Sequence, residues 1–468
     1  MRYLPLCPAE RAAMLEAMGR RSIQELFEHI PEPLRLARPL DLPGPMSEPE
    51  IVEFFRRAAG ESSPDYVSFL GAGAYSHYRP VAVDSLLSRG EFFSAYTPYQ
   101  AEIAQGTLQA MFEFQTLMAQ LTGMDVSNAS LYDGSTAATE AVLMALRILR
   151  SRRVLVARSV HPEYRQVLRT YLQHQGVDIQ ELPFNGAGQL EIEKLESDLR
   201  QGPACLLAQS PNFFGVLEPI AEISARVHGA RGLVIAAVAE PLSLALVRPP
   251  SEADIVCGEA QSFGIAVSYG GPFGGFLAAK EQYVRQMPGR IVGETRDTEG
   301  RRGFVLTLAT REQHIRREKA TSNICTNQSL SALAATIYLS LLGKRGLKAL
   351  AEQNLAKAHY AARELAAVRG VSIPFSGRFF NEFTIRVPGR AEELLAALRD
   401  EEIIGGLPLG RFYPELSDHL LIAATETASR ADMDRMVRIY RQVLGANSTP
   451  RRRGERGQAK PSSEAVVR

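Results

Sequence analysis

The stretch "ACLLAQSPNFFGVLEPIAEISARVHGARGLVIAAV", residues 204–238, decides the fold class. It begins and ends with short runs of apolar residues that are typical of buried strands. Between these runs, residues 218–232 carry apolar side chains at helical spacing. Strand, helix and strand in this order predict two parallel strands joined by a helical crossover.

The same alternation extends to both sides of this unit. Apolar runs at 152–160, 177–184 and 253–260 predict further strands, and residues 163–176 and 191–202 predict helices. We therefore expect an α/β fold in which a mainly parallel sheet is covered by helices. In such sheets the functional loops lie beyond the carboxyl ends of the strands.

A long amphipathic helix is predicted across residues 99–124, ahead of the sheet. Its apolar side chains recur at steps of three and four residues, so one face should be largely buried. The side chains on that face are Leu108, Met111, Phe114, Met118 and Leu121.

The pattern changes from about Ser329 onward. A long helical region with an interruption near Gly343 leads into a strand, strand, helix, strand order, which fits a small α+β domain. Ser429 is placed to cap a closing helix that has Asp432 in its first turn. The predicted segments are a helical region at 329–368, strands at 371–375, 381–387 and 419–425, and helices at 392–403 and 429–445.

These patterns divide the chain into four parts. We expect an N-terminal helical arm at 1–60, a large α/β domain at 61–328, a small C-terminal α+β domain at 329–445 and a disordered basic tail at 446–468. In the arm, Ser22 and Glu25 have the spacing of a capping box. The arm has too few apolar positions to bury itself and should lie on another surface, in its own body or a partner's.

Composition narrows the class of protein. The 468 residues carry a formal charge of +1, and the tail holds six basic and two acidic residues without an aromatic side chain, which is typical of disorder rather than nucleic-acid binding. No apolar segment suits a signal peptide or a membrane span, so we expect a cytoplasmic protein without a membrane or nucleic-acid partner. The cysteines lack metal-ligand spacing and should be reduced thiols: Cys7, Cys205, Cys257 and Cys325.

Three predicted loops carry polar residues suited to a ligand. In "YDGSTAATEA", Gly134, Ser135 and Thr136 begin a helix, whose free N–H groups can bind a phosphate or simply be capped. In "SVHPEY", His161 could stack on a flat cofactor ring or be structural. In "QSPNFFGVLEP", Asn212 could bind a ring substituent or hold an Asx turn.

In this order, the loops resemble the large domain of fold-type-I pyridoxal-phosphate enzymes, the aspartate-aminotransferase superfamily. Longer strings are similar to the N-terminal half of glycine decarboxylase, the P-protein family of the glycine cleavage system, from about Arg2 to Leu444. The strings that carry this resemblance include "FLGAGAYSHYRPVAV", "YTPYQAEIAQG", "GGPFGGFLA", "MPGRIVG" and "REKATSNICTNQ".

The resemblance implies that a second, homologous half or subunit carries the coenzyme lysine. In this chain, "GEAQSFG" places Gln261 at the lysine position, and Ala237 lies near the position of the acidic partner of the pyridinium nitrogen. An amide nitrogen is not nucleophilic and cannot form a Schiff base. We therefore expect no catalytic residue in this chain and a vestigial pocket formed by Gly134, Ser135, Thr136, His161 and Asn212.

The active sites of fold-type-I enzymes lie at a subunit interface, so a subunit can complete its neighbour's site. Candidates toward a partner's coenzyme are Thr321, Ser322, Asn323 and Thr326, and candidates for the substrate or channel are Tyr96, Thr97, Tyr99, Gln100 and Glu102. Their hydroxyl and amide groups can bind a phosphate or a glycine carboxylate. The same aromatic residues could equally be packing in a turn before the helix.

The implied partners are a second subunit, which holds pyridoxal 5'-phosphate covalently, the lipoylated H-protein and glycine as substrate. The assembled enzyme would decarboxylate glycine and transfer the aminomethyl group to the lipoyl arm. Two alternatives remain open, a non-catalytic scaffold or regulatory subunit and a self-sufficient homodimer that uses another lysine. Lys319 and Lys280 are the lysines considered for that role among seven in the chain, the others being Lys194, Lys344, Lys348, Lys357 and Lys460.

Overall fold

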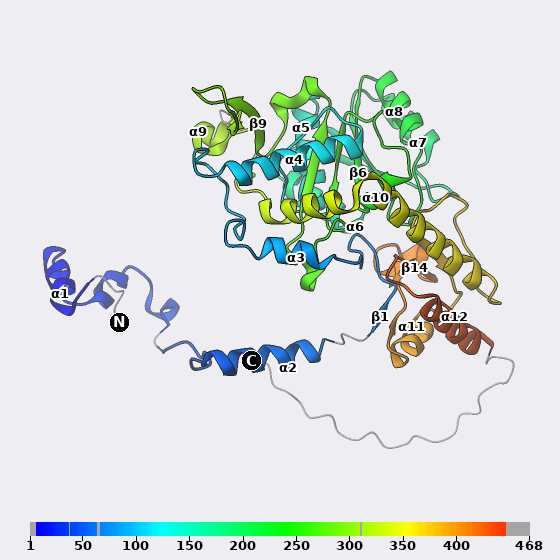
Figure 1. Ribbon diagram of the computed structural model, residues 1–468, viewed down its shortest axis with the longest axis horizontal. Helices are drawn as coiled ribbons and strands as arrows, with labels where there is room; N and C mark the ends of the chain where they lie inside the picture. Colours follow the sequence, from blue (N-terminus) through cyan, green and yellow to red (C-terminus); the bar gives the residue numbers. More distant parts are fainter. Residues whose placement is uncertain (1–5, 37, 63–65, 309–310, 446–468) are drawn as a thin grey trace, which may run out of the picture. The chain divides into compact units, whose positions relative to one another are not determined.

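The computed structural model describes residues 6–36, 38–62, 66–308 and 311–445, and the chain divides into two compact units at residue 64. The first unit holds the helices of the predicted arm (Figure 1). The predicted tail at 446–468 lies outside the described residues. The predicted division of residues 61–445 into a large and a small domain stays a prediction.

The first unit differs from the expectation at its second helix. Helix α1 spans Pro8–Ala17, but the segment after Ser22 is a short 3-10 helix, Ile23–Phe27, and the Ser22 side chain makes no capping bond. A helix that the sequence patterns had not indicated, α2, spans Glu48–Gly60. Its capping box is formed by Ser47, whose N–H and hydroxyl both donate to Glu50 at 2.7 Å.

The second unit is built on a seven-stranded sheet of order β2-β8-β7-β6-β5-β3-β4. The strands from β4 to β7 in this order are parallel, whereas β8 and β2 are antiparallel to their neighbours. This arrangement confirms the predicted α/β class with a mainly parallel sheet. The strands are β2 (Val126–Ser127), β3 (Arg153–Ala157), β4 (Asp178–Leu182), β5 (Cys205–Gln209), β6 (Leu233–Val238), β7 (Ile255–Glu259) and β8 (Gly275–Ala279).

Helices pack along the sheet because they present apolar faces to it. Helix α5 lies against β5, β6, β7 and β8, and α4 lies against α10 (Figure 1). Helix α4 confirms four of the five predicted core residues as buried, with Leu121 partly buried. These helices are α3 (Val81–Leu87), α4 (Gln105–Thr122), α5 (Gly134–Leu149), α6 (Pro162–Leu172), α7 (Ile192–Leu199), α8 (Ile220–Gly229) and α10 (Ser329–Ala366).

The C-terminal part confirms most of its predicted elements. Helix α10 is interrupted at Gly343, where φ is 58°, and Ser429 caps the last helix by accepting the Asp432 N–H at 3.1 Å. The predicted strand at 371–375 is wrong, because this segment makes only a single bridge between Ser372 and Arg386. The remaining elements are β11 (Glu382–Arg386), α11 (Ala391–Asp400), β12 (Ile403–Ile404), β13 (Leu407–Pro408), β14 (His419–Ala423) and α12 (Arg430–Gly445).

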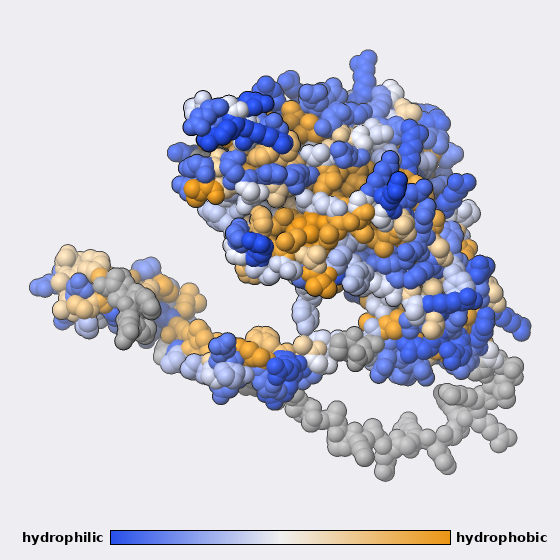
Figure 2. Space-filling model, viewed as in Figure 1, coloured by the Kyte–Doolittle hydropathy of each residue, from blue (hydrophilic) through white to orange (hydrophobic). Residues whose placement is uncertain are grey.

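One region of the surface of the second unit is apolar. Hydrophobic side chains gather over α3, α4 and α10 (Figure 2). An apolar groove of about 490 Å³ lies there, lined by Leu86, Phe92, Leu333, Ile337 and Leu341 among others. Among the described residues, no helix is both long and apolar enough to cross a bilayer.

Candidate functional site

The carboxyl edge of the sheet carries the loops that the sequence indicated. His161 follows β3, Asn212 follows β5 and Gln261 follows β7. A cleft of about 430 Å³ opens at the start of α5. Gly134, Ser135 and His161 line this cleft, whereas Asn212 and Gln261 are not among its lining residues.

The first residues of α5 bind carboxylates of the chain itself. The Gly134 N–H donates to Glu259 Oε2 at 2.9 Å, and the Thr136 N–H donates to Asp133 Oδ1 at 2.8 Å. The Ser135 hydroxyl donates to the same Asp133 oxygen at 2.6 Å. Gly134, Ser135 and Thr136 are therefore engaged by internal anions.

Glu259 accepts the first N–H of α5 through one of its oxygens. Its other oxygen accepts the N–H groups of Ala260 and Gly274, each at 3.0 Å. Burial raises the pKa of Glu259 to about 7, and these N–H groups act in the opposite direction. A helix N-terminus attracts anions, and here a side chain of the protein itself takes the Gly134 N–H.

His161 is held by neighbouring protein groups. Its Nε2 donates to the Ala72 carbonyl at 2.8 Å, and its Nδ1 accepts the Glu163 N–H at 3.2 Å. Its ring stacks on Tyr164 with centroids 5.0 Å apart. Burial lowers the pKa of His161, and the N–H that Nδ1 accepts places the ring proton on Nε2.

Asn212 is fully used within its own loop. Its Nδ2 donates to the Gly188 carbonyl at 2.7 Å and to Glu218 at 2.8 Å, and its Oδ1 accepts the N–H groups of Phe214 and Val216. This is the Asx-type turn that was the structural interpretation of this residue. No hydrogen-bonding capacity of the side chain is left for a ring substituent.

Gln261 is buried, and its side chain binds backbone groups of Tyr75 and Ile265. Its Oε1 accepts the Tyr75 N–H at 2.9 Å, and its Nε2 donates to the carbonyls of Tyr75 at 3.1 Å and Ile265 at 2.8 Å. Ala237 lies fully buried within β6, and the first carboxylate beyond that strand is Glu240. Ala237 therefore faces no ligand, and Glu240 is the acidic group at this strand end.

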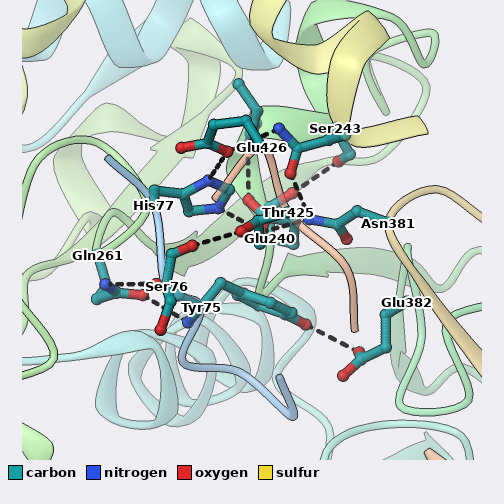
Figure 3. A network of polar contacts seen from close by, with 12 residues as sticks. Tyr75, Ser76, His77, Glu240, Ser243, Gln261, Asn381, Glu382, Thr425 and Glu426 are labelled. Carbon is teal, nitrogen blue, oxygen red and sulfur yellow. Dashed lines mark hydrogen bonds and ion pairs between the residues drawn. The ribbon is translucent and has the colours of Figure 1, made fainter. Parts of the chain in front are cut away.

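Glu240 takes part in a buried polar network (Figure 3). The imidazole of His77 lies between two carboxylates, with Nε2 3.0 Å from Glu240 and Nδ1 2.8 Å from Glu426. Asn381 Nδ2 also donates to Glu240 at 3.0 Å. Burial opposes the charged ring, but the attraction and hydrogen bonds of Glu240 and Glu426 raise the pKa of His77 to about 10.

Glu382 joins the network from β11. Its Oε1 accepts the Ala72 N–H at 2.6 Å, and its Oε2 accepts the Tyr75 hydroxyl at 3.0 Å. Burial raises the pKa of Glu382 to about 8, with the Ala72 and Tyr75 hydrogen bonds opposing this shift. The segment that contains Tyr75 and His77 is thus held from the seven-stranded sheet and from the C-terminal strands together (Figure 3).

The loop 96–102 lies away from the cleft-lining residues and is only partly exposed. Tyr96 is 71% exposed, and Gln100 and Glu102 are also exposed, but Thr97 is buried. The Tyr99 hydroxyl accepts a hydrogen bond from Arg290 at 2.7 Å. The hydrogen bond from Arg290 thus holds Tyr99, whose side chain is still 46% exposed, while Tyr96, Gln100 and Glu102 face outward.

The loop 321–326 borders the cleft. The Cys325 N–H donates to the hydroxyl of Tyr132, a cleft residue, at 3.3 Å. The Ser322 hydroxyl accepts the Ile324 N–H at 3.0 Å and lowers the pKa of Glu140, which burial raises more strongly. Asn323 is exposed, and Thr321 and Thr326 are partly exposed.

Arg290 links the two loops. Besides Tyr99 it pairs with Glu312, and the residue before Glu312, Arg311, accepts the Thr321 N–H on its carbonyl at 3.0 Å. The two loops are therefore connected through these residues, and loop 321–326 is the one that borders the cleft.

Comparison with known proteins gives this arrangement a family. The profile of the glycine cleavage system P-protein matches residues 1–440. The chain belongs to this family. P-protein relatives from Solibacter usitatus and Koribacter versatilis, each named a probable glycine dehydrogenase (decarboxylating) subunit 1, are 55% and 51% identical over 439 and 435 residues. The alignments cover 93% of this chain and 96% and 98% of those relatives.

Solved structures agree with the family. A crystal structure of a glycine decarboxylase P-protein in inhibitor-bound form matches with a TM-score of 0.82 and 42% identity, covering 95% of this chain and 100% of that one. The sphingosine-1-phosphate lyase of Burkholderia pseudomallei matches with a TM-score of 0.65 and 14% identity, covering 89% and 94%, and shares the fold. The predicted fold-type-I architecture of this P-protein chain is confirmed.

Four residues of the site were missed from the sequence: His77, Glu240, Glu259 and Glu382. Glu240 and Glu259 had a usable signal, because Glu259 ends an apolar strand and Glu240 lies two residues beyond one, both at the functional edge. His77 and Glu382 had none, since their partners lie more than 100 residues away in the chain.

Proposed function

We propose that this P-protein chain is one of two homologous subunits of glycine decarboxylase, and that the other subunit holds pyridoxal 5'-phosphate. The observation that carries the proposal is the set of side chains at this chain's own pocket. Glu259 accepts the first N–H of α5, and Gln261 stands where the resemblance places the lysine. These residues do not fit the coenzyme.

In the assembled enzyme the coenzyme serves as the electron sink for decarboxylation of glycine. The aminomethyl group then passes to the lipoyl arm of the H-protein. This chain contributes no nucleophile to that chemistry. Its part is to bind the second subunit, to border the path of the lipoyl arm and to supply polar groups across the interface.

The outward residues of the two loops suit this role. Tyr96 and Asn323 expose a ring and an amide, and Gln100 and Glu102 add further polar groups. Hydrogen bonds from such groups to the charged coenzyme phosphate or the glycine carboxylate are worth about 1.5–3 kcal/mol each. Ser322 supports the shape of its own loop, because its hydroxyl accepts the Ile324 N–H.

The apolar groove between α3, α4 and α10 supports a permanent partner (Figure 2). Phe93, close to the groove residue Phe92, is 69% exposed, and Leu341 in the groove is 52% exposed. Exposed apolar surface that is rimmed by polar residues is typical of a protein interface. We assign it to the second subunit because the candidate loop 96–102 follows directly in the chain.

A self-sufficient homodimer finds no support in the positions of the candidate lysines. Lys280 directly follows β8, which lies between β2 and β7, and its Nζ is 4.0 Å from Asp254. Lys319 is exposed in a short turn. Neither lysine lines the cleft at the start of α5.

Tyr96→Ala and Asn323→Ala test the contribution of the two loops. Each variant is mixed with the second subunit, H-protein and coenzyme, and glycine–bicarbonate exchange is measured together with binding between the subunits. We expect a loss of exchange of about 10-fold or more at unchanged subunit affinity, which corresponds to the loss of one hydrogen bond to a charged group. Tyr171→Ala, at an exposed tyrosine of α6, is the matched control.

Full exchange in both variants would favour the scaffold alternative instead. Exchange catalysed by this chain without the second subunit would favour the homodimer.

A further inference from the structure

We propose that residues 72–77 form an internal replacement for the coenzyme ring, which we call the plug, and that Glu259 replaces the coenzyme phosphate. The plug makes the contacts that the strand ends of this fold offer to a coenzyme. The inference rests on the proposed correspondence of Gln261 to the lysine position. It adds to the proposed function that the pocket is filled in a specific way rather than merely lacking a lysine.

The residues after strands β3, β7 and β6 contact successive parts of the plug. After β3, His161 donates to the Ala72 carbonyl, and its ring lies against Gly73, where an added Cβ would be only 3.1 Å from Cδ2 and Nε2. After β7, Gln261 binds both the N–H and the carbonyl of Tyr75.

After β6, the carboxylate of Glu240 binds His77. Fold-type-I enzymes place an acidic group at this strand end against a protonated ring nitrogen of the coenzyme. In this chain the protonated ring nitrogen belongs to the protein itself. The Nε2 edge of His161, the side chain at the lysine position and the acidic strand end thus all bind one segment.

The helix end at the phosphate's place is engaged as well. Glu259 accepts the first N–H of α5, and the hydroxyl of Tyr164 fills the space above Gly134, where an added Cβ would overlap it. The cleft of about 430 Å³ lies between residues 72–74 of the plug and this helix end, so a phosphate that bound the Gly134 N–H would have to displace the Glu259 side chain. Residues 72–74 of the plug and Glu259 line the same cleft, but each is held by its own hydrogen bonds.

The plug also connects the C-terminal strands to the seven-stranded sheet. Glu382 accepts the Ala72 N–H, and Glu426 binds His77 and accepts the Tyr78 N–H at 2.6 Å. The Thr425 hydroxyl donates to the Ser76 carbonyl at 2.5 Å (Figure 3).

The other groups around the ring of His77 are polar or weakly acidic. They include Asn354 and Asn381, which donate to Glu426 and Glu240, and the side chain of Tyr75. The arrangement of these two parts of the chain is therefore fixed without a ligand.

Hydrogen exchange of the full-length isolated chain tests the plug directly. The amides of Ala72, Tyr75 and Tyr78 should exchange at least about 100-fold more slowly than those of the exposed turn at Tyr269, because each is bonded to a side chain. Added pyridoxal 5'-phosphate should leave these rates unchanged. Rapid exchange of these amides, or a change in their rates on adding the coenzyme, would overturn the proposal.

A second variant tests whether the missing lysine alone excludes the coenzyme. Gln261→Lys is incubated with pyridoxal 5'-phosphate, reduced with borohydride and mapped by peptide mass, so that labelling of exposed lysines such as Lys319 is counted separately. We expect no label at position 261 in the folded variant. Label there would show that the pocket is open and would refute the plug.

His77→Gln completes the test if the lysine variant does not fold. It should speed exchange at Tyr75 and Tyr78 by about 10-fold or more, whereas the exposed-site control His174→Gln should not. Equal exchange rates at Tyr75 and Tyr78 in His77→Gln and His174→Gln would refute the role of His77 in holding the plug. These readouts use this chain without its partner, so their failure is separate from a failure of the two-subunit function, which appears only in the mixed enzyme.

Discussion

Replacing His77 by glutamine should remove a pH-dependent contribution to folding. The side chain is 3% exposed and lies between the carboxylates of Glu240 and Glu426. Although burial disfavours the charged ring, these carboxylates raise the pKa of His77 to about 10. The folded chain therefore holds an imidazolium at neutral pH, and His77→Gln leaves two buried carboxylates without a cation.

The sign and size of the effect follow from linkage. An unfolded histidine has a pKa of about 6.5, so the stabilisation is fully present below about pH 6.5 and is lost as the pH rises through about 10. The loss per pH unit can reach about 1.4 kcal/mol. Removing one partner of a buried ion pair costs about 3–5 kcal/mol, which is the deficit that we expect for the variant near pH 6.5.

Urea unfolding of the wild type and His77→Gln at several pH values between about 6.5 and 10 measures this contribution. The difference in free energy of unfolding should shrink steadily with rising pH. His174→Gln, at an exposed histidine, should follow the wild type. The same pH dependence in the wild type and in His77→Gln would refute the buried imidazolium.

Three further outcomes test the site. Gly134→Ala should lower the melting temperature without affecting any ligand, because its Cβ would overlap the Tyr164 hydroxyl; unchanged stability would contradict the packing. Asn212→Ala should cost about 2–3 kcal/mol in urea unfolding, because buried groups lose their partners; a cost below about 0.5 kcal/mol would show that the loop is held otherwise. A thiol reagent should label Cys7 and Cys325 of the folded chain rapidly, and Cys205 and Cys257 only on unfolding, because burial raises the pKa of both buried thiols. Equal labelling rates at all four cysteines would contradict this expectation.

The sequence predicted the parts of the fold that local pattern controls. Strands β5 (Cys205–Gln209) and β6 (Leu233–Val238) are mostly or wholly apolar, so their burial and their order along the chain could be inferred. The capping bond at Ser429 depends only on neighbours and was also predicted. The short strand expected at 371–375 failed because its pairing partner, not its own composition, decides whether it joins the sheet.

The site was predicted in outline but not in its contacts. The loss of the lysine at Gln261 is visible in the sequence, whereas the backbone that Gln261 binds lies 186 residues away. Likewise Glu259 is visible beside the strand, but its place on the α5 N-terminus follows only from folding. Long-range pairs of this kind carry no local periodicity, so one sequence cannot reveal them.

Glycine–bicarbonate exchange as a function of subunit ratio tests the central claim most directly. Each subunit is assayed alone with coenzyme and H-protein, and this chain is then titrated into a fixed amount of the second subunit. We predict no exchange by this chain alone and a rise to saturation at equal amounts of the two subunits. Exchange by this chain alone, or a mixture no more active than the second subunit by itself, would contradict the account.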